Sequence, residues 1–119
     1  MRFVSIASGS SGNCIYAGTE STHILVDAGI STRRIKTGLA QLELSMDELD
    51  GILITHEHSD HIKGLRVFLK KYPLPLYASA PVLEYLQENV ELPASVSLHE
   101  ADPEGFCRRY AGETLCHLP

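Results

Sequence analysis

The most constraining feature of this sequence is an apolar segment that runs directly into a cluster of potential metal ligands. Residues 51–55 are short and almost entirely apolar, which predicts a strand buried on both faces. Three of the six histidines of the chain follow within six residues, together with Asp60. In α/β proteins, small molecules and ions bind in the crevice beyond the carboxyl ends of the strands. The sequence therefore predicts an α/β protein with a site at the end of this strand.

The spacing within 56–61 predicts which side chains share that site. His56 and His58 are two residues apart, so in extended backbone they point to the same side. The chain must then turn into a helix, which brings Asp60 and His61 to face the same space. Imidazole nitrogen and carboxylate oxygen suit Zn²⁺, and also Mn²⁺ or Fe. A solvated polar loop is the competing interpretation, and Glu57 is expected to point outward in either case.

The remaining pattern predicts a layered α/β domain that begins with an antiparallel meander. Alternating or β-branched apolar runs between turn residues indicate strands, and we expect them at 2–7, 14–17, 23–27, 51–55, 76–78, 96–98 and 113–116. Apolar residues at helical spacing predict helices over 31–42, over 62–72, and from 79–81 to about 93. Residues 100–111 are expected to be a loop.

Composition narrows the class of protein. A chain of 119 residues can build one hydrophobic core and not two. Its formal net charge of −5 excludes a basic nucleic-acid coat, and no apolar run approaches the length of a membrane span. Three cysteines, an odd number far apart in sequence, make a disulfide framework improbable and favour a cytoplasmic protein. We expect Cys107 and Cys116 to be buried thiols rather than ligands.

The segment 54–65, ITHEHSDHIKGL, resembles the metal-binding signature of the metallo-β-lactamase superfamily. The resemblance implies an αββα sandwich and a site for two Zn²⁺ ions. It implies that His56 and His58 bind the first metal and that Asp60 and His61 bind the second. Asp60 would also be catalytic, by orienting the attacking water or hydroxide.

Two further segments support the resemblance. Asp27, which closes the expected strand 23–27, matches a strand-end Asp that holds the ligating histidines in this family; an ordinary turn residue is the alternative. The small-residue run 8–14, SGSSGNC, is similar to the WalJ/YycJ-type branch, whose members are thought to act on DNA as exonucleases. Glycine-rich loops can cradle phosphate through backbone N–H groups, although they more often form a turn.

The resemblance implies that residues 1–119 are the N-terminal half of such a domain. Family members are longer, and their further ligating His and Asp residues lie in the second half. His117 lies before the expected position of the next ligand, so we interpret it as a strand or terminal histidine. The same interpretation applies to His23 and His99.

Three functional hypotheses follow. The first is a zinc-dependent hydrolase that cleaves nucleic-acid phosphodiesters, the second a thioester hydrolase of the glyoxalase II kind, and the third an inactive metal-binding fragment. Lys63 and Arg66, beside the metal motif, are candidates for steering a DNA backbone, with a solvated helix face as the alternative. Residues 33–36 contain a second basic group. DNA is the expected partner, and no membrane partner is expected.

Overall fold

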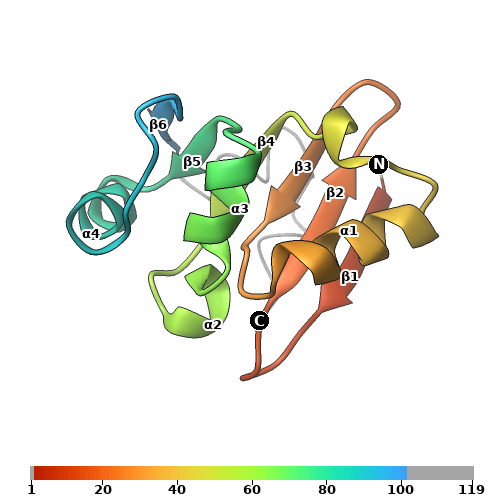
Figure 1. Cartoon of the computed structure of the whole chain (residues 1–119), viewed down its shortest axis with the longest axis horizontal. Helices are drawn as coiled ribbons and strands as arrows, with labels where there is room; N and C mark the ends of the chain where they lie inside the picture. The colour runs from red at the N-terminus through yellow and green to blue at the C-terminus, as the bar shows by residue number, and fades with distance from the viewer. Residues whose placement is uncertain (1, 102–119) are drawn as a thin grey trace.

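The computed structural model describes residues 2–101, which form one six-stranded sheet with helices packed against it. The strands lie side by side in chain order: β1 (Arg2–Ala7), β2 (Cys14–Gly18), β3 (His23–Val26), β4 (Gly51–Ile54), β5 (Leu76–Ala78) and β6 (Leu98–Glu100). The helices are α1 (Thr32–Gln41), α2 (Ser59–Ile62), α3 (Leu65–Lys71) and α4 (Ala80–Asn89), with a 3₁₀ turn, η1 (Met46–Glu48), before β4 (Figure 1).

The strand pairing changes once along the sheet, from antiparallel to parallel. β1, β2 and β3 pair antiparallel, which confirms the expected meander. From β3 onward the pairs are parallel, with Val26 opposite Leu53 and Ile54 opposite Ala78. Parallel neighbours need a crossover connection, and helices supply each of them. The carboxyl ends of β3, β4 and β5 therefore meet at one edge of the sheet.

The main core lies between the sheet and its helices. Leu25, Ile52 and Ile54 on the sheet pack in the same buried cluster as residues of α1, α3 and α4, among them Ile35, Leu39, Phe68, Leu69 and Leu86. Strand residues of opposite parity form a second cluster on the other face, made of Ala17, Ile24 and Val26 with Phe3 and Ile15. All four residues of β4 are buried, which confirms the prediction of a strand covered on both faces.

The helix expected over 31–42 is present as α1. Ser31 caps it, because its side chain accepts a hydrogen bond from the Arg34 backbone N–H. Ile35 and Leu39, one turn apart, form its buried side. In this helix the apolar spacing was sufficient to predict both its extent and its buried face.

The helix expected over 62–72 is present as α3, but it begins at Leu65 rather than at residue 62. A separate short helix, α2, begins at Ser59, and the two are divided by a break at Lys63 and Gly64. Gly64 donates its backbone N–H to the carbonyl of Ala28, at 2.9 Å, rather than continuing the first helix. A Cβ at this position would overlap the Ile30 carbonyl oxygen, so the break marks a close approach of two segments.

Two other boundaries differ from expectation. α4 ends at Asn89 rather than near residue 93, because Val90 takes extended backbone. The last described strand spans 98–100 rather than 96–98, because Val96 donates to the Pro93 carbonyl in a turn and pairing with β5 begins only beyond it. The strand expected at 113–116 and nearly all of the loop expected at 100–111 lie outside the described residues. None of the helices within residues 2–101 has the length and apolar character needed to span a membrane.

Candidate metal centre

Three segments meet at the sheet edge where β3 and β4 end. Asp27 directly follows β3, and residues 55–58 directly follow β4. Asp27 donates its backbone N–H to Leu53, and Ala28 donates to the carbonyl of His61, both at 2.8 Å. The loop 8–13 between β1 and β2 is the third segment. The parallel pairing of β3 and β4 is what brings residue 27 next to the predicted metal motif.

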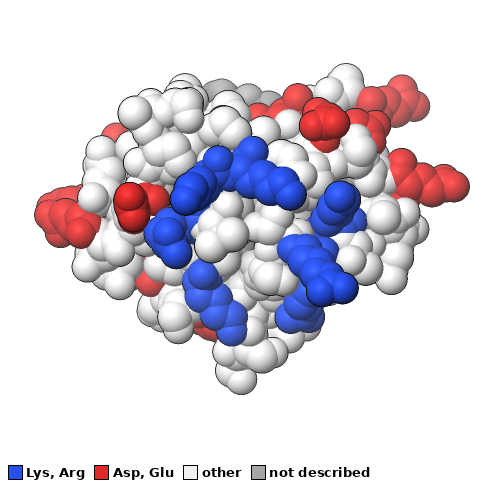
Figure 2. Space-filling view, viewed as in Figure 1, with Lys and Arg blue, Asp and Glu red and all other residues white. Residues whose placement is uncertain are grey.

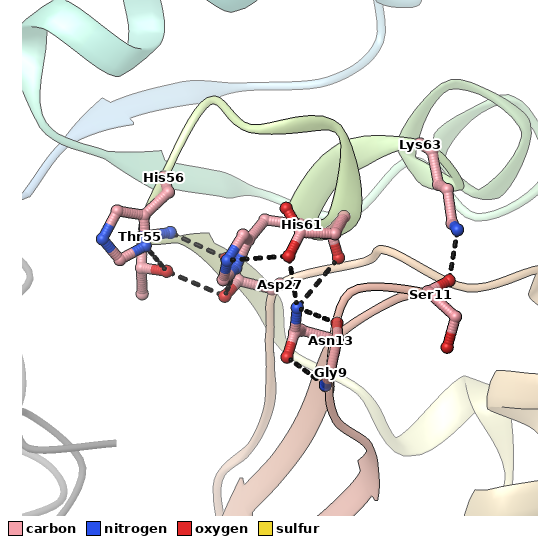
Figure 3. A network of polar contacts seen from close by, with 9 residues as sticks. Gly9, Ser11, Asn13, Asp27, Thr55, His56, His61 and Lys63 are labelled. Atoms are coloured by element: carbon pink, nitrogen blue, oxygen red, sulfur yellow. Dashed lines mark hydrogen bonds and ion pairs between the residues drawn. The ribbon is translucent and has the colours of Figure 1, made fainter. Parts of the chain in front are cut away.

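Asp27 organises the interior of this edge. It is 4% exposed, and it is one of two non-glycine residues with positive φ within residues 2–101, at 66°. Aspartate is among the residue types that tolerate this backbone region. Its Oδ1 accepts the Thr55 backbone N–H at 2.8 Å, and its Oδ2 accepts both the Thr55 hydroxyl at 2.8 Å and His61 Nδ1 at 2.6 Å. Figure 3 shows Thr55, His56 and His61 gathered around this carboxylate.

These contacts select one tautomer for each of two neutral imidazoles. The Asp27 carboxylate can only accept, so Nδ1 of His61 donates to it, and in the neutral imidazole Nε2 is then the acceptor nitrogen. The Thr55 hydroxyl gives its proton to Asp27, so its oxygen accepts from His56 Nδ1, at 2.9 Å. Both histidines are thus held in the tautomer that offers Nε2 to a metal.

Asp60 is held from the opposite side, by the small-residue loop. Asn13 donates its backbone N–H to the Asp60 carbonyl at 2.7 Å and its Nδ2 to the Asp60 Oδ2 at 3.1 Å. The Asn13 side chain also closes its own loop, by accepting from the Gly9 N–H and donating to the Gly9 carbonyl. The described contacts of Asn13 therefore position Asp60, and they do not themselves form a phosphate cradle.

The predicted ligands are gathered but not fully convergent. The ring centroids of His56, His58 and His61 lie 4.9 to 6.4 Å apart, and Asp60 Oδ2 is 3.8 Å from His61 Nε2. Within residues 2–101, no set of three or more His, Cys, Asp or Glu side chains is in an arrangement that could hold a metal ion as it stands. His61 is buried, and His56 and His58 are exposed. The donor types fit a Zn²⁺, Mn²⁺ or Fe site.

The two candidate steering residues differ in their surroundings. The Lys63 ammonium contacts the carbonyl oxygen of Ser11 and so ties the end of α2 to the small-residue loop (Figure 3). Arg66 is exposed and lines a cavity of about 280 Å³ together with Lys63, Tyr85 and Glu57. Arg66 is therefore the freer of the two cations.

Sequence reasoning missed Thr55 and Asn13 as members of the site. The apolar pattern identifies Thr55 only as the end of a strand, although its position directly before His56 puts its hydroxyl within reach. Asn13 lies in the small-residue run SGSSGN, but nothing local links it to Asp60, 47 residues away. Among the other histidines, His23 bonds the Tyr16 hydroxyl and His99 bonds Ser97; His117, Cys107 and Cys116 lie outside the described residues.

Cys14 is the free thiol within the described part of the chain, and it is fully buried. Burial, with a smaller contribution from the negative charge of Asp27, raises its pKa to about 12. The side chain is therefore a neutral packing residue at ordinary pH, although it directly follows Asn13.

Comparison with known proteins agrees with this architecture. The model of the metallo-beta-lactamase superfamily matches residues 7–111. Rm3 metallo-beta-lactamase superimposes with a TM-score of 0.67 at 19% identity, over 87% of this chain and 43% of that one. A metallo-beta-lactamase from Cronobacter sakazakii gives 0.66 at 19% identity, over 82% of this chain and 40% of that one. The chain belongs to the metallo-beta-lactamase superfamily, and its described residues form part of the αββα fold, as expected.

Two curated relatives show which branch of the superfamily this chain resembles. Exodeoxyribonuclease YycJ of Bacillus anthracis is 46% identical over 93 residues, which is 76% of this chain and 35% of that protein. Exodeoxyribonuclease WalJ of Streptococcus pneumoniae is 45% identical over 84 residues, 71% of this chain and 31% of that protein. The expected resemblance to the WalJ/YycJ-type branch is confirmed. The chain spans about a third of the length of these relatives.

Proposed function

We propose that residues 1–119 form the N-terminal part of a metal-dependent hydrolase domain that cleaves DNA phosphodiester bonds. The observation that carries the proposal is the hydrogen-bonded set of Asp27, Thr55, His56 and His61. A solvated polar loop has no need of a buried carboxylate that sets the tautomer of two neighbouring histidines. Such outer contacts orient metal-ligating histidines in proteins.

In this proposal the ligands are His56 and His58 for one Zn²⁺ ion, and Asp60 and His61 for a second; Mn²⁺ or Fe would suit the same donors. When bound, the metal would supply Lewis acidity and would make a water molecule nucleophilic near neutral pH. Asp60 would orient the attacking water, and Asn13 holds the Asp60 carboxylate in place. Asp27 and Thr55 keep the imidazoles aimed outward. Further ligands would come from the remainder of the domain.

Two observations support DNA as the substrate. The relatives with 45% and 46% identity are named exodeoxyribonucleases. Arg66 and Lys63 stand beside the motif, where positive charge would attract a phosphate backbone. We expect the protein to act in the cytoplasm, where the Cys14 thiol would remain reduced.

The decisive experiment measures metal content and hydrolysis in the full-length protein. We expect bound zinc or another divalent metal, release of nucleotides from end-labelled DNA, loss of this activity on chelation, and recovery when metal is returned. S-lactoylglutathione serves as the competing substrate. Hydrolysis of the thioester without hydrolysis of DNA would establish the second hypothesis instead.

The ligand assignment has its own test. His58→Ala is expected to lower metal content and activity sharply, whereas His99→Ala, which removes an exposed imidazole from β6, serves as the matched control. Unchanged metal stoichiometry in the His58→Ala protein would show that the assignment is wrong.

A further inference from the structure

The positive charge of the described chain is concentrated on one face. Within residues 2–101, every Lys and Arg except Arg2 lies on α1 or in the segment 63–71, and all of these side chains are exposed: Arg33, Arg34, Lys36, Lys63, Arg66, Lys70 and Lys71. Figure 2 shows the Lys and Arg side chains in an arc over this helix layer. We call these residues the basic helix face. The fold thus places the cations of α1 on the same face as those of segment 63–71, about 30 residues later in the sequence.

Two acidic residues, Glu57 and Glu91, line the same cavity as Lys63 and Arg66, but neither is in ion-pair contact with these cations. No Lys or Arg in the part of the chain that the structure describes forms a salt bridge with Asp or Glu; the ion pairs found there involve His61. In Figure 2 most of the Asp and Glu side chains lie toward the edges of the view, and acidic atoms also lie directly beside the left end of the arc of cations. Glu84 and Glu88 are exposed on α4, and Asp47 and Glu48 are exposed on η1. A protein with net charge −5 therefore keeps a separate cluster of unpaired cations.

Both groups begin at the edge that carries the candidate metal centre. Lys63 follows His61 by two residues, and α1 starts shortly after Asp27. From there the cations continue along α1 and α3 toward Lys36 and Lys70. A ligand lying on this face would therefore have one end at the metal edge.

We propose that the basic helix face binds the phosphate backbone of DNA beyond the scissile bond. The inference rests on the proposed function for its choice of ligand, and it adds a binding surface that is separate from the metal ligands. Arg66 and Lys70 are one helical turn apart, about 6 Å along α3. Successive phosphates of one strand are about 3.4 Å apart along a duplex axis, so the two cations can contact different phosphates.

Exposed cations of this kind act through counterion release. Each phosphate that a Lys or Arg neutralises contributes about −0.9 to the slope of log K against log salt. Such contacts carry no base specificity. The face therefore suits an enzyme that must hold DNA of any sequence while its end is processed.

The test measures DNA binding by the full-length protein in the presence of chelator, so that no hydrolysis occurs. A fluorescently labelled duplex is titrated over a range of salt concentrations. The variant R33Q/R34Q/K36Q removes the α1 group, whose side chains form no hydrogen bond or salt bridge with the candidate ligands within residues 2–101. We expect a loss of affinity of about tenfold or more at ~0.1 M salt, and a salt slope shallower by about 2 to 3.

Single substitutions supply a matched control. Arg34→Gln and Gln87→Glu each make the net charge of the protein more negative by one, but Gln87 is exposed on α4, between Glu84 and Glu88. We expect Arg34→Gln to weaken binding more than Gln87→Glu. If the triple variant does not fold, as judged by circular dichroism, this pair decides the question. Equal affinities and salt slopes in the two single variants would overturn the proposal.

A small substrate separates this inference from the proposed function. Hydrolysis of bis(p-nitrophenyl) phosphate by the metal-loaded protein needs the metal centre and no extended surface. We expect the triple variant to retain it while losing activity on long DNA. Salt-sensitive DNA binding that depends on α1, without any phosphodiesterase activity, would refute the proposed function and leave the surface established. Phosphodiesterase activity with unchanged DNA binding in the triple variant would refute the surface alone.

Discussion

A single buried carboxylate links the strand β3 to the chemistry expected after β4. Asp27 accepts three hydrogen bonds, from the backbone and hydroxyl of Thr55 and from His61. A buried charge is stable only when its acceptors are occupied in this way. Its contacts extend to His56 through the Thr55 hydroxyl. One residue outside the histidine motif therefore sets the orientation of two of its imidazoles.

Asp27→Asn tests this dependence. The amide keeps the shape of the side chain, but an amide N–H in place of the Oδ2 acceptor would face Nδ1 of His61 and favour the tautomer with the proton on Nε2. We expect metal affinity to fall by about 10- to 100-fold, measured by competition with a chromophoric chelator. Asp50→Asn is the control, because Asp50 accepts from the His23 backbone at the start of β3. Equal affinities in the two variants would contradict the role of Asp27.

Cys14 leads to a prediction about alkaline stability. Burial raises its pKa from 9.0 to about 12 in the folded protein, so between these values the folded state holds a proton that the unfolded state has lost. The free energy of unfolding must therefore fall as pH rises through this window. We expect the urea midpoint to drop between about pH 9 and about pH 11, and to drop less in Cys14→Ala. An identical pH dependence in both proteins would show that the thiol does not contribute.

At the scale of elements, the geometry of the candidate metal centre depends on backbone segments that lie in close contact. Gly29 lies against the Asp60 carbonyl and Gly64 against the Ile30 carbonyl, with no room for a Cβ at either position. These contacts hold α2 against the segment 27–30 that leaves β3. They also explain why the segment 59–71 forms two short helices, since a continuous helix could not make the turn at Gly64.

Gly64→Ala is expected to destabilise the fold. The added methyl would meet backbone carbonyls that cannot move aside, and overpacking of this kind costs about 1–3 kcal/mol. Gly38→Ala is the contrasting variant, because there the methyl would meet the branch of the Ile6 side chain, which can shift more readily than a backbone carbonyl, and helix propensity would improve. Urea unfolding of the two variants compares them directly. A larger loss of stability for Gly38→Ala would disprove this reasoning.

The accuracy of the sequence predictions varied with how local the determining contacts are. The meander, α1 and β4 were predicted well, because apolar spacing and cap residues act within a few residues. The break in 62–72 could not be predicted, because it depends on Ala28 and Ile30, more than 30 residues away. The shift of β6 has a similar cause, since its start depends on pairing with β5.

At the scale of the whole molecule, the fold places positive and negative side chains on different parts of the surface, which the net charge does not reveal. The net charge of −5 alone predicts a protein that polyanions repel. The arc of cations over α1 and α3 predicts the opposite local behaviour (Figure 2). Such asymmetry permits attraction to nucleic acid while the protein as a whole remains acidic.

Chromatography on a polyanion provides a simple measure of this asymmetry. We expect the protein to be retained on heparin at low salt despite its net charge, because the exposed cations act locally over about one Debye length. Elution should occur at moderate salt, and earlier for R33Q/R34Q/K36Q than for the unmodified protein. Passage of the unmodified protein through the column at low salt would contradict a functional charge separation.

The sequence by itself determined the class of this protein and the chemical types at its centre. Residues 56–61 contain the candidate donor atoms within one short segment. The hydrophobic periodicity that predicts helices and strands likewise depends on residues close together in sequence. The resemblance already implied Asp27, and Thr55 adjoins His56 in sequence. Only the tertiary structure decided that Asn13 holds Asp60 and that α1 and α3 join into one basic face (Figure 2). The reason is physical, because hydrogen-bond partners and surface charge depend on which strands pair and which loops meet, and no local pattern contains that information.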